Sequence, residues 1–206
     1  MAMTDTLNIQ IRRIPVWAIY LVLALPGLWL FLQAFTNRLG VDPVKALEHE
    51  LGRVALQLLI VGLAITPARR HLNLNLLKFR RAVGLVAFAY IALHLLVWLV
   101  LDVQILSQVW ADIVKRPYIT IGLLAFLMAL PLALTSNGLS IRKLGKRWGK
   151  LHKLVYGVCL LGGLHFIMLA KGFQIEPLIY MTVVISLLAL RLVPKPVRRA
   201  KAGASA

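Results

Sequence analysis

Long apolar stretches alternate with short polar or basic stretches along the whole chain. Six apolar stretches approach the roughly 20 residues that an α-helix needs to cross about 30 Å of bilayer hydrocarbon. The pattern therefore predicts an all-α fold, a bundle of six transmembrane helices. We expect Pro26-Gly27 to kink the first helix or loosen its packing, and Pro67 to close the second, which is short unless it begins near Val44. The predicted spans are residues 14–35, 51–66, 82–101, 118–135, 148–171 and 178–193.

The same pattern gives the domain organisation. Residues 1–13 form a polar amino-terminal tail, residues 14–193 one six-helix transmembrane domain, and residues 194–206 a basic carboxy-terminal tail. We expect loops between the spans, including residues 102–117 and the basic stretch 136–150. No internal repeat is visible in the sequence.

Composition supports an integral membrane protein. Hydrophobic residues make up 60% of the 206 residues and the mean hydropathy is +0.82, whereas soluble domains are roughly half apolar. The net charge of +17 does not indicate nucleic-acid binding, because the basic residues lie between hydrophobic segments instead of on a soluble face. The lone cysteine, Cys159, lies inside an apolar stretch and can form no internal disulfide.

Lysine and arginine are distributed unevenly between alternate connections, and this distribution predicts orientation. Eighteen lie in residues 1–13, 67–81, 136–153 and 191–206, whereas five lie in the other connections and Arg53 stands near a helix start. Since positive residues prefer the cytoplasmic side, both termini are expected in the cytoplasm. Six of the seven acidic residues fall on or near the opposite side.

Two histidines lie deep inside predicted spans. His94 follows Arg81 by 13 residues, and His165 follows His152 by 13 residues. Because the third and fifth helices run in the same direction, the two deep imidazoles should lie at one depth, about 20 Å along each helix from the cytoplasmic edge. Ionisable residues inside membranes usually mark functional sites, and two level imidazoles can clamp a metal or a haem iron.

Haem is favoured over a bare metal ion. No carboxylate or thiolate is expected at that depth to complete a bare metal site, whereas a porphyrin needs only axial ligands. Gly162 and Gly163 would let a flat macrocycle approach the helix, and Tyr90 and Trp98 would enclose it. The alternative is that the histidines only form hydrogen bonds between helices.

The remaining histidines carry weaker hypotheses. His152 could hold a second haem, but 13 residues turn an ideal helix by about 220°, and the matching position is Arg81, whose natural partners are haem propionates or lipid phosphates. His49 could contact a quinone or a haem propionate together with Arg53, or could belong to a polar cluster that faces water. His71, among arginines, is expected to be solvated.

Several segments together resemble one family. The chain from about Asp42 to Arg191 is similar to bacterial haem b proteins of the ferric-reductase-like transmembrane family. The similarity lies in the segments HELGRVALQLLIVGLAITP, RRAVGLVAFAYIALH, RPYITIGLLAFLMALPLALTS, RKLGKRWGKLHKLVYGV and EPLIYMTVVISLLALR.

The resemblance implies a location, cofactors and partners. Such proteins lie in the bacterial inner membrane, with haem ligands that would correspond to His94, His152 and His165. They pass electrons from the quinone pool to a periplasmic molybdopterin enzyme that reduces methionine sulfoxide in oxidised proteins. A bound flavin mononucleotide (FMN) is also implied, although no glycine loop that would hold its phosphate is visible.

Wider relatives, the NADPH oxidases and ferric reductases, differ from this sequence in two ways. They have two histidines on each of two helices and a cytoplasmic flavin domain, whereas this chain has Arg81 at the fourth position and ends soon after the sixth span. We therefore do not expect it to oxidise NADPH by their route.

The sequence thus predicts a redox subunit that conducts electrons through haem and is not itself the catalytic subunit. One alternative is a ferric or cytochrome b561-like reductase with a small periplasmic acceptor. Another is a six-helix transporter, although transporters commonly show internal repeats.

Overall fold

A computed structural model describes residues 2–170 and 172–193, and every regular element within them is helical. Six stretches of this part are long and apolar enough to cross a membrane, which confirms the predicted all-α six-helix bundle. Lys171 and the predicted basic tail at 194–206 lie outside the described residues. The main helices are α2 (Val16–Phe35), α3 (Pro43–His71), α4 (Arg80–Val97), α6 (Pro117–Leu134), α9 (Leu154–Leu169) and α10 (Ile175–Leu192).

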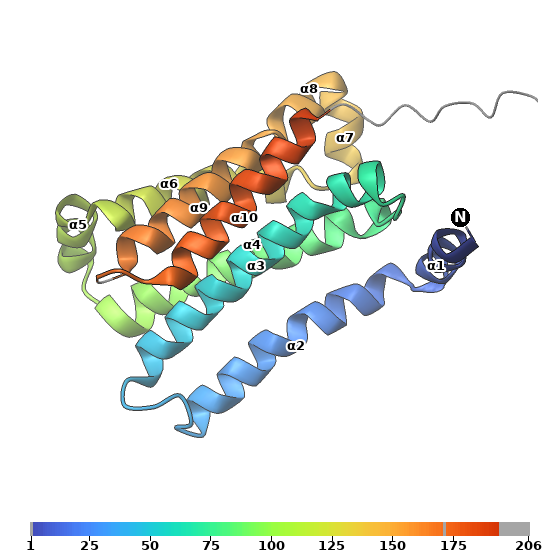
Figure 1. The fold of residues 1–206 in the computed structure, drawn as a ribbon. Helices are drawn as coiled ribbons and strands as arrows, with labels where there is room; N and C mark the ends of the chain where they lie inside the picture. The colour runs from blue at the N-terminus through green and yellow to red at the C-terminus, as the bar shows by residue number, and fades with distance from the viewer. Residues whose placement is uncertain (1, 171, 194–206) are drawn as a thin grey trace, which may run out of the picture.

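The six helices form two closely packed pairs and two flanking helices (Figure 1). Helix α3 packs most extensively against α4, and α6 packs most extensively against α9. Helix α10 lies along α9 and α3, while α2 covers α4 and α3 from the other side. The two pairs meet through α4 with α6 and through α3 with α9. This arrangement places α4, which carries His94, and α9, which carries His165, in one bundle.

Short helices occupy connections that the sequence pattern predicted as tails or loops. They are α1 (Ala2–Arg13), η1 (Leu77–Phe79), α5 (Leu106–Lys115), α7 (Gly138–Leu144) and α8 (Lys146–Leu151). The π-helix η2 (Trp98–Val103) instead continues α4 at the end of the predicted third span. Helices α1, α7 and α8 lie at one end of the bundle and α5 lies at the other (Figure 1). On α5, Leu106, Trp110 and Val114 form an exposed apolar stripe at helical spacing, which suits a helix lying at a membrane surface.

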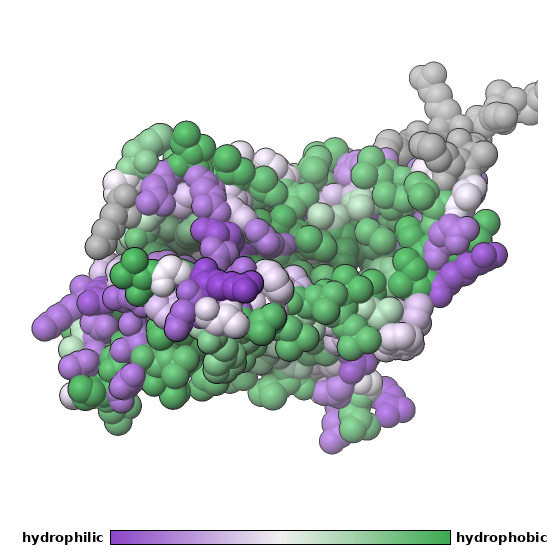
Figure 2. All heavy atoms as spheres, turned by 90° about the horizontal axis from the view of Figure 1, so that it is seen from below, coloured by the Kyte–Doolittle hydropathy of each residue, from purple (hydrophilic) through white to green (hydrophobic). Residues whose placement is uncertain are grey.

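The surface agrees with a membrane location. Many large apolar side chains on the long helices are exposed, among them Leu21, Leu28 and Trp29 on α2. Hydrophobic residues cover much of the face in Figure 2, and hydrophilic side chains gather at its left and right ends and in a group left of its centre. A water-soluble protein rarely exposes an apolar surface this extensive.

The prediction that Pro67 closes the second span is wrong. Helix α3 begins at Pro43 and continues through Pro67 to His71. Asp42 caps its start, because the Asp42 side chain accepts a hydrogen bond from the Lys45 amide. Proline has no amide hydrogen to donate to the carbonyl four residues earlier, which is that of Leu63. Arg191 of α10 donates to the Leu63 carbonyl instead, at 2.6 Å. A tertiary contact thus supplies the hydrogen bond that the proline removes.

The expected irregularity at Pro26-Gly27 is stabilised in a similar way. The Tyr90 hydroxyl of α4 accepts from the Gly27 amide at 2.6 Å and donates to the Leu23 carbonyl at 2.9 Å. In a regular helix these two backbone groups would bond to each other, since they are four residues apart. Tyr90 therefore ties α2 to α4, and its polar end serves this helix contact instead of enclosing a cofactor.

Candidate functional site

His94 is held by the amino-terminal half of α3. Its Nδ1 lies 2.8 Å from the carbonyl oxygen of Glu48. The ring lies directly against Gly52, where an added Cβ would come within 3.1 Å of that Nδ1. Since a carbonyl can only accept, Nδ1 carries the proton, and Nε2 is left with a free lone pair. The ring is half-buried.

His165 is held in the same manner by α6. Its Nδ1 lies 2.7 Å from the carbonyl oxygen of Tyr118. An added Cβ at Gly122 would come within 2.8 Å of that nitrogen, and the Tyr118 ring lies 6.1 Å from the imidazole. The same reasoning places the proton on Nδ1 and the lone pair on Nε2.

The two histidines thus have equivalent supports on two helix pairs. In each pair the accepting carbonyl stands four residues before the glycine, so both lie on one face of the supporting helix. The ring centres of His94 and His165 lie 6.2 Å apart, with an angle of 78° between the rings. The structure therefore brings together the two residues that depth matching paired, although their role as ligands stays a prediction.

This arrangement fits a haem group. Metal-binding histidines usually donate their second ring nitrogen to a carbonyl or carboxylate, which fixes the tautomer and the ring orientation. His94 and His165 would hold the metal through Nε2, because Nδ1 of each ring is already bonded to a carbonyl. Among the described residues, no group of three or more His, Cys, Asp and Glu side chains could hold a bare metal ion. Two axial ligands suit a porphyrin, which supplies the other four nitrogens.

Gly162 and Gly163 do not have the role predicted for them. A Cβ at Gly163 would meet the Met181 side chain of α10 at 3.0 Å, and one at Gly162 would meet Leu56 of α3 at 3.7 Å. These glycines allow α9 to approach its neighbours. The glycines against the histidines, Gly52 and Gly122, were not predicted, because they lie on other helices.

His152 lies in the turn between α8 and α9, so the ideal-helix angle to His165 does not apply. Its ring stacks on Trp148 at 3.8 Å between centres, and its Nε2 lies 3.5 Å from the Ser136 hydroxyl. Arg81 is exposed near the start of α4. In the described part of the chain, no hydrogen bond or ring contact joins Arg81 to His152. The structure therefore does not bring Arg81 and His152 together, whereas His94 and His165 lie side by side.

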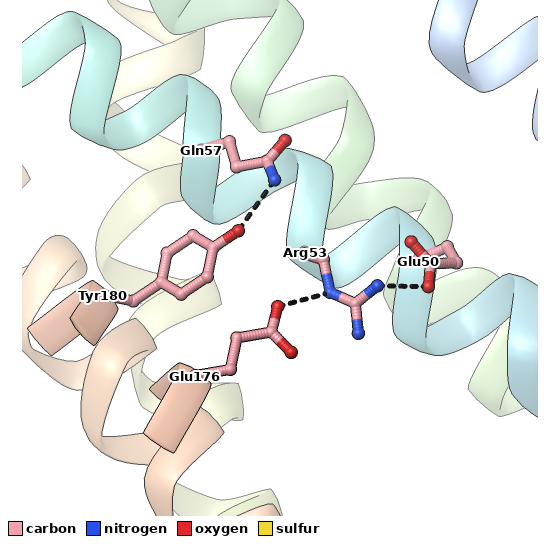
Figure 3. Close-up of polar contacts among 5 residues, drawn as sticks. All are labelled: Glu50, Arg53, Gln57, Glu176 and Tyr180. Carbon is pink, nitrogen blue, oxygen red and sulfur yellow. Dashed lines mark hydrogen bonds and ion pairs between the residues drawn. The ribbon is translucent and has the colours of Figure 1, made fainter. Parts of the chain in front are cut away.

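Among the described residues, no hydrogen bond or ring contact joins the other predicted polar residues to the histidine pair. Arg53 forms ion pairs with Glu50 and with Glu176 of α10, the latter at 3.0 Å (Figure 3). His49 is exposed. The Nε2 of His71 lies 3.4 Å from the carbonyl oxygen of Leu190, near the other end of the bundle.

The fold and the paired histidines define a class of protein, a multi-pass helical membrane protein with two imidazoles side by side between helix pairs. A family model described as "Ferric reductase like transmembrane component" matches residues 51–163. The chain belongs to this family, as its resemblance predicted.

Three curated relatives carry the same more specific name, "Protein-methionine-sulfoxide reductase heme-binding subunit MsrQ". The protein of Agrobacterium fabrum is 49% identical over 179 residues, which are 86% of this chain and 83% of the relative. That of Brucella anthropi is 46% identical over 187 residues, 90% and 85% of the two chains. That of Brucella ovis is 47% identical over 177 residues, 85% and 80%.

Proposed function

We propose that this protein is the haem b electron-transfer subunit of a methionine sulfoxide reductase system, in which His94 and His165 would hold one haem. The observation that carries the proposal is the pair of rings 6.2 Å apart, each with Nδ1 on a backbone carbonyl. The MsrQ names of the relatives support the same cofactor and system. When bound, the haem supplies one-electron redox chemistry.

The protein's own residues supply position and environment. The Glu48 and Tyr118 carbonyls orient the two rings, and Gly52 and Gly122 make room for them. The surrounding apolar helices exclude water and lower the local dielectric constant, which tunes a haem's reduction potential.

We propose further that the chain lies in the bacterial inner membrane with both termini in the cytoplasm. In that orientation, His94 and His165 are nearer the periplasmic ends of α4 and α9. This depth supports transfer to a periplasmic MsrP-like molybdopterin reductase for the repair of oxidised proteins. Quinol from the bilayer or a cytoplasmic flavin reductase is the proposed electron source. FMN is implied by family resemblance, and we assign no residues to it.

His152 is a candidate ligand for a second haem, and Arg81 a candidate partner for its propionates. Support comes from the family resemblance and from the position of His152 near the cytoplasmic start of α9. Because His152 now contacts Trp148 and Ser136, binding there would require the ring to leave the Ser136 hydroxyl. Loss of one of two haems in His152→Ala would support this second site, and an unchanged haem content would remove it.

The proposed function is tested by following haem oxidation in the purified protein. After chemical reduction, the visible spectrum should show a b-type haem. The reduced signal should decay when the MsrP-like enzyme and a methionine sulfoxide substrate are both added, and persist when either is omitted. Absence of the haem signal would overturn the proposal. Oxidation by ferric citrate but not by the partner would favour the ferric reductase alternative.

A further inference from the structure

Helix α5 is confined to one boundary of the membrane by the spans on either side of it. The third span ends at Val103 and the fourth begins at Pro117, so α5 fills most of the connection between them (Figure 1). Its 10 residues make a helix of about 15 Å. Because each end of α5 is joined by a short linker to the end of a span, the helix lies along the membrane boundary.

The side chains of α5 fall into distinct sectors around the helix. One sector is an uncharged apolar stripe with a spacing of four residues, and each of its side chains is at least 68% exposed. The stripe consists of Leu106, Trp110 and Val114. Val109, beside the stripe, is buried against the bundle. The polar residues Gln108 and Lys115 lie roughly 150° around the helix from Trp110. One face of α5 thus suits apolar surroundings and the opposite face suits water.

The stripe continues the lipid-facing surface of the third span. Val100 and Leu101, near the end of that span, are exposed, and so is Ile105, which connects them to Leu106. Since lipid covers the exposed apolar side chains of the span, lipid is also the occupant that fits the adjoining stripe. Tryptophan is enriched at the boundary between hydrocarbon and water, which is where this placement puts Trp110.

The joint between α5 and α6 is stiff. Only Arg116 separates the two helices, with extended backbone angles of −116° and 94°, and the following Pro117 favours that conformation. Asp112 of α5 pairs with Arg116 at 3.2 Å. The Thr120 hydroxyl of α6 donates to the Ile113 carbonyl of α5 at 2.6 Å. These contacts couple the position of α5 to the first turn of α6.

That first turn carries the support of His165. Tyr118 is the second residue of α6, and its carbonyl oxygen lies 2.7 Å from His165 Nδ1. Arg116 also donates to the Tyr118 hydroxyl at 3.4 Å. A displacement of α5 would therefore move the carbonyl that fixes the orientation of the His165 ring.

We propose that α5 is a membrane-surface anchor that positions His165. Its apolar stripe lies in the head-group boundary of the bilayer, and this placement holds the Tyr118 carbonyl where it orients the imidazole. The anchor is argued from α5 and its neighbouring spans alone. Its consequence for haem rests on the proposed function, because it requires His165 to be a ligand.

The first experiment locates the two faces of α5. Full-length protein with its haem is placed in phosphatidylcholine nanodiscs, with a nitroxide label on one introduced cysteine in Trp110→Cys, Val114→Cys, Gln108→Cys or Lys115→Cys. Cys159 is buried, so the unmodified protein should take up no label. Collisions of the nitroxide with oxygen, which concentrates in lipid, are compared with collisions with a water-soluble nickel complex. Labels at positions 110 and 114 should collide mainly with oxygen, and labels at 108 and 115 mainly with nickel.

The second experiment tests the coupling to His165. Val114→Glu places a charge in the stripe, and Gln108→Glu places the same charge on the water face as the matched control. Val114→Glu should expose a label at position 110 to nickel and lower haem affinity about two- to tenfold, through the weakened hydrogen bond between Tyr118 and His165. It should also shift the electron paramagnetic resonance signal of ferric haem, which is sensitive to the orientation of imidazole ligands. Gln108→Glu and the apolar replacement Val114→Leu should keep the wild-type affinity and signal.

The outcomes separate the two parts of the proposal. Labels at positions 110 and 114 that collide mainly with nickel would overturn the anchor and favour a protein partner for the stripe. Unchanged haem affinity and an unchanged ferric signal in Val114→Glu would overturn the coupling to His165. Absence of haem from the unmodified protein would be a failure of the proposed function, and the collision measurements would still decide whether α5 is anchored.

Discussion

Gly122→Ala tests how tightly the supporting helices hold the histidines. The new methyl carbon would lie 2.8 Å from His165 Nδ1, a separation that requires the ring or the helix to move. Overpacking of this kind costs about 1–3 kcal/mol, and weakening the bond to the Tyr118 carbonyl adds about 0.5–1.5 kcal/mol.

The penalty is therefore about 2 kcal/mol or more, and it falls on the state in which His165 is held in place. We expect haem affinity to fall roughly 30-fold, while the protein without haem stays folded because its ring is free to turn away. Gly52→Ala should have a smaller effect, since its Cβ would lie 3.1 Å from His94 Nδ1.

The assay is haem titration of each purified variant, followed by the haem absorbance per protein. Gly84→Ala is the matched control, because it lies on α4 with nothing within 4 Å of an added Cβ. Wild-type haem affinity in Gly122→Ala would refute the reasoning, as would an equal loss in Gly84→Ala.

Two further predictions concern contacts that hold helix α3 in place. Arg191→Leu removes the donor to the Leu63 carbonyl and to the Tyr156 hydroxyl, and it should destabilise the protein by about 2 kcal/mol. This loss should lower the midpoint of thermal unfolding in detergent. An unchanged midpoint would contradict the role of Arg191. Asp42→Ala should lower the midpoint at neutral pH, because the Lys45 amide holds the pKa of Asp42 below its ordinary value. That stabilisation is present above the ordinary pKa and is lost as the pH falls through the lowered pKa, so wild type and Asp42→Ala should converge in acid. A difference that persists unchanged in acid would show that the carboxylate is not responsible.

The sequence pattern predicted the helical spans well, because bilayer thickness imposes a similar length on each. It also paired His94 with His165, since equal distances from basic edges place both at one depth. It failed where tertiary contacts override local rules. Pro67 does not end α3, because Arg191 replaces the missing donor, and nothing in the sequence near Pro67 identifies a residue so far along the chain.

The residues that hold the two histidine rings could not be predicted from the sequence alone. Gly52 and Gly122 each stand four residues after the residue whose carbonyl accepts from the histidine, yet such spacings are common in apolar helices. Their role becomes visible only when α3 is placed on α4 and α6 on α9. Gly162 and Gly163 drew attention because they are near His165 in sequence, but the helix turns them toward Leu56 and Met181.

The most direct test of the central claim is a visible spectrum, recorded as reduced minus oxidised, of the purified protein and three histidine variants. If His94 and His165 bind one haem, the unmodified protein gives a b-type signal, and His94→Ala and His165→Ala each lose most of it. His71→Ala, whose ring lies near the Leu190 carbonyl at the other end of the bundle, keeps the full signal. Full haem content in either deep-site variant would contradict the paired-ligand account.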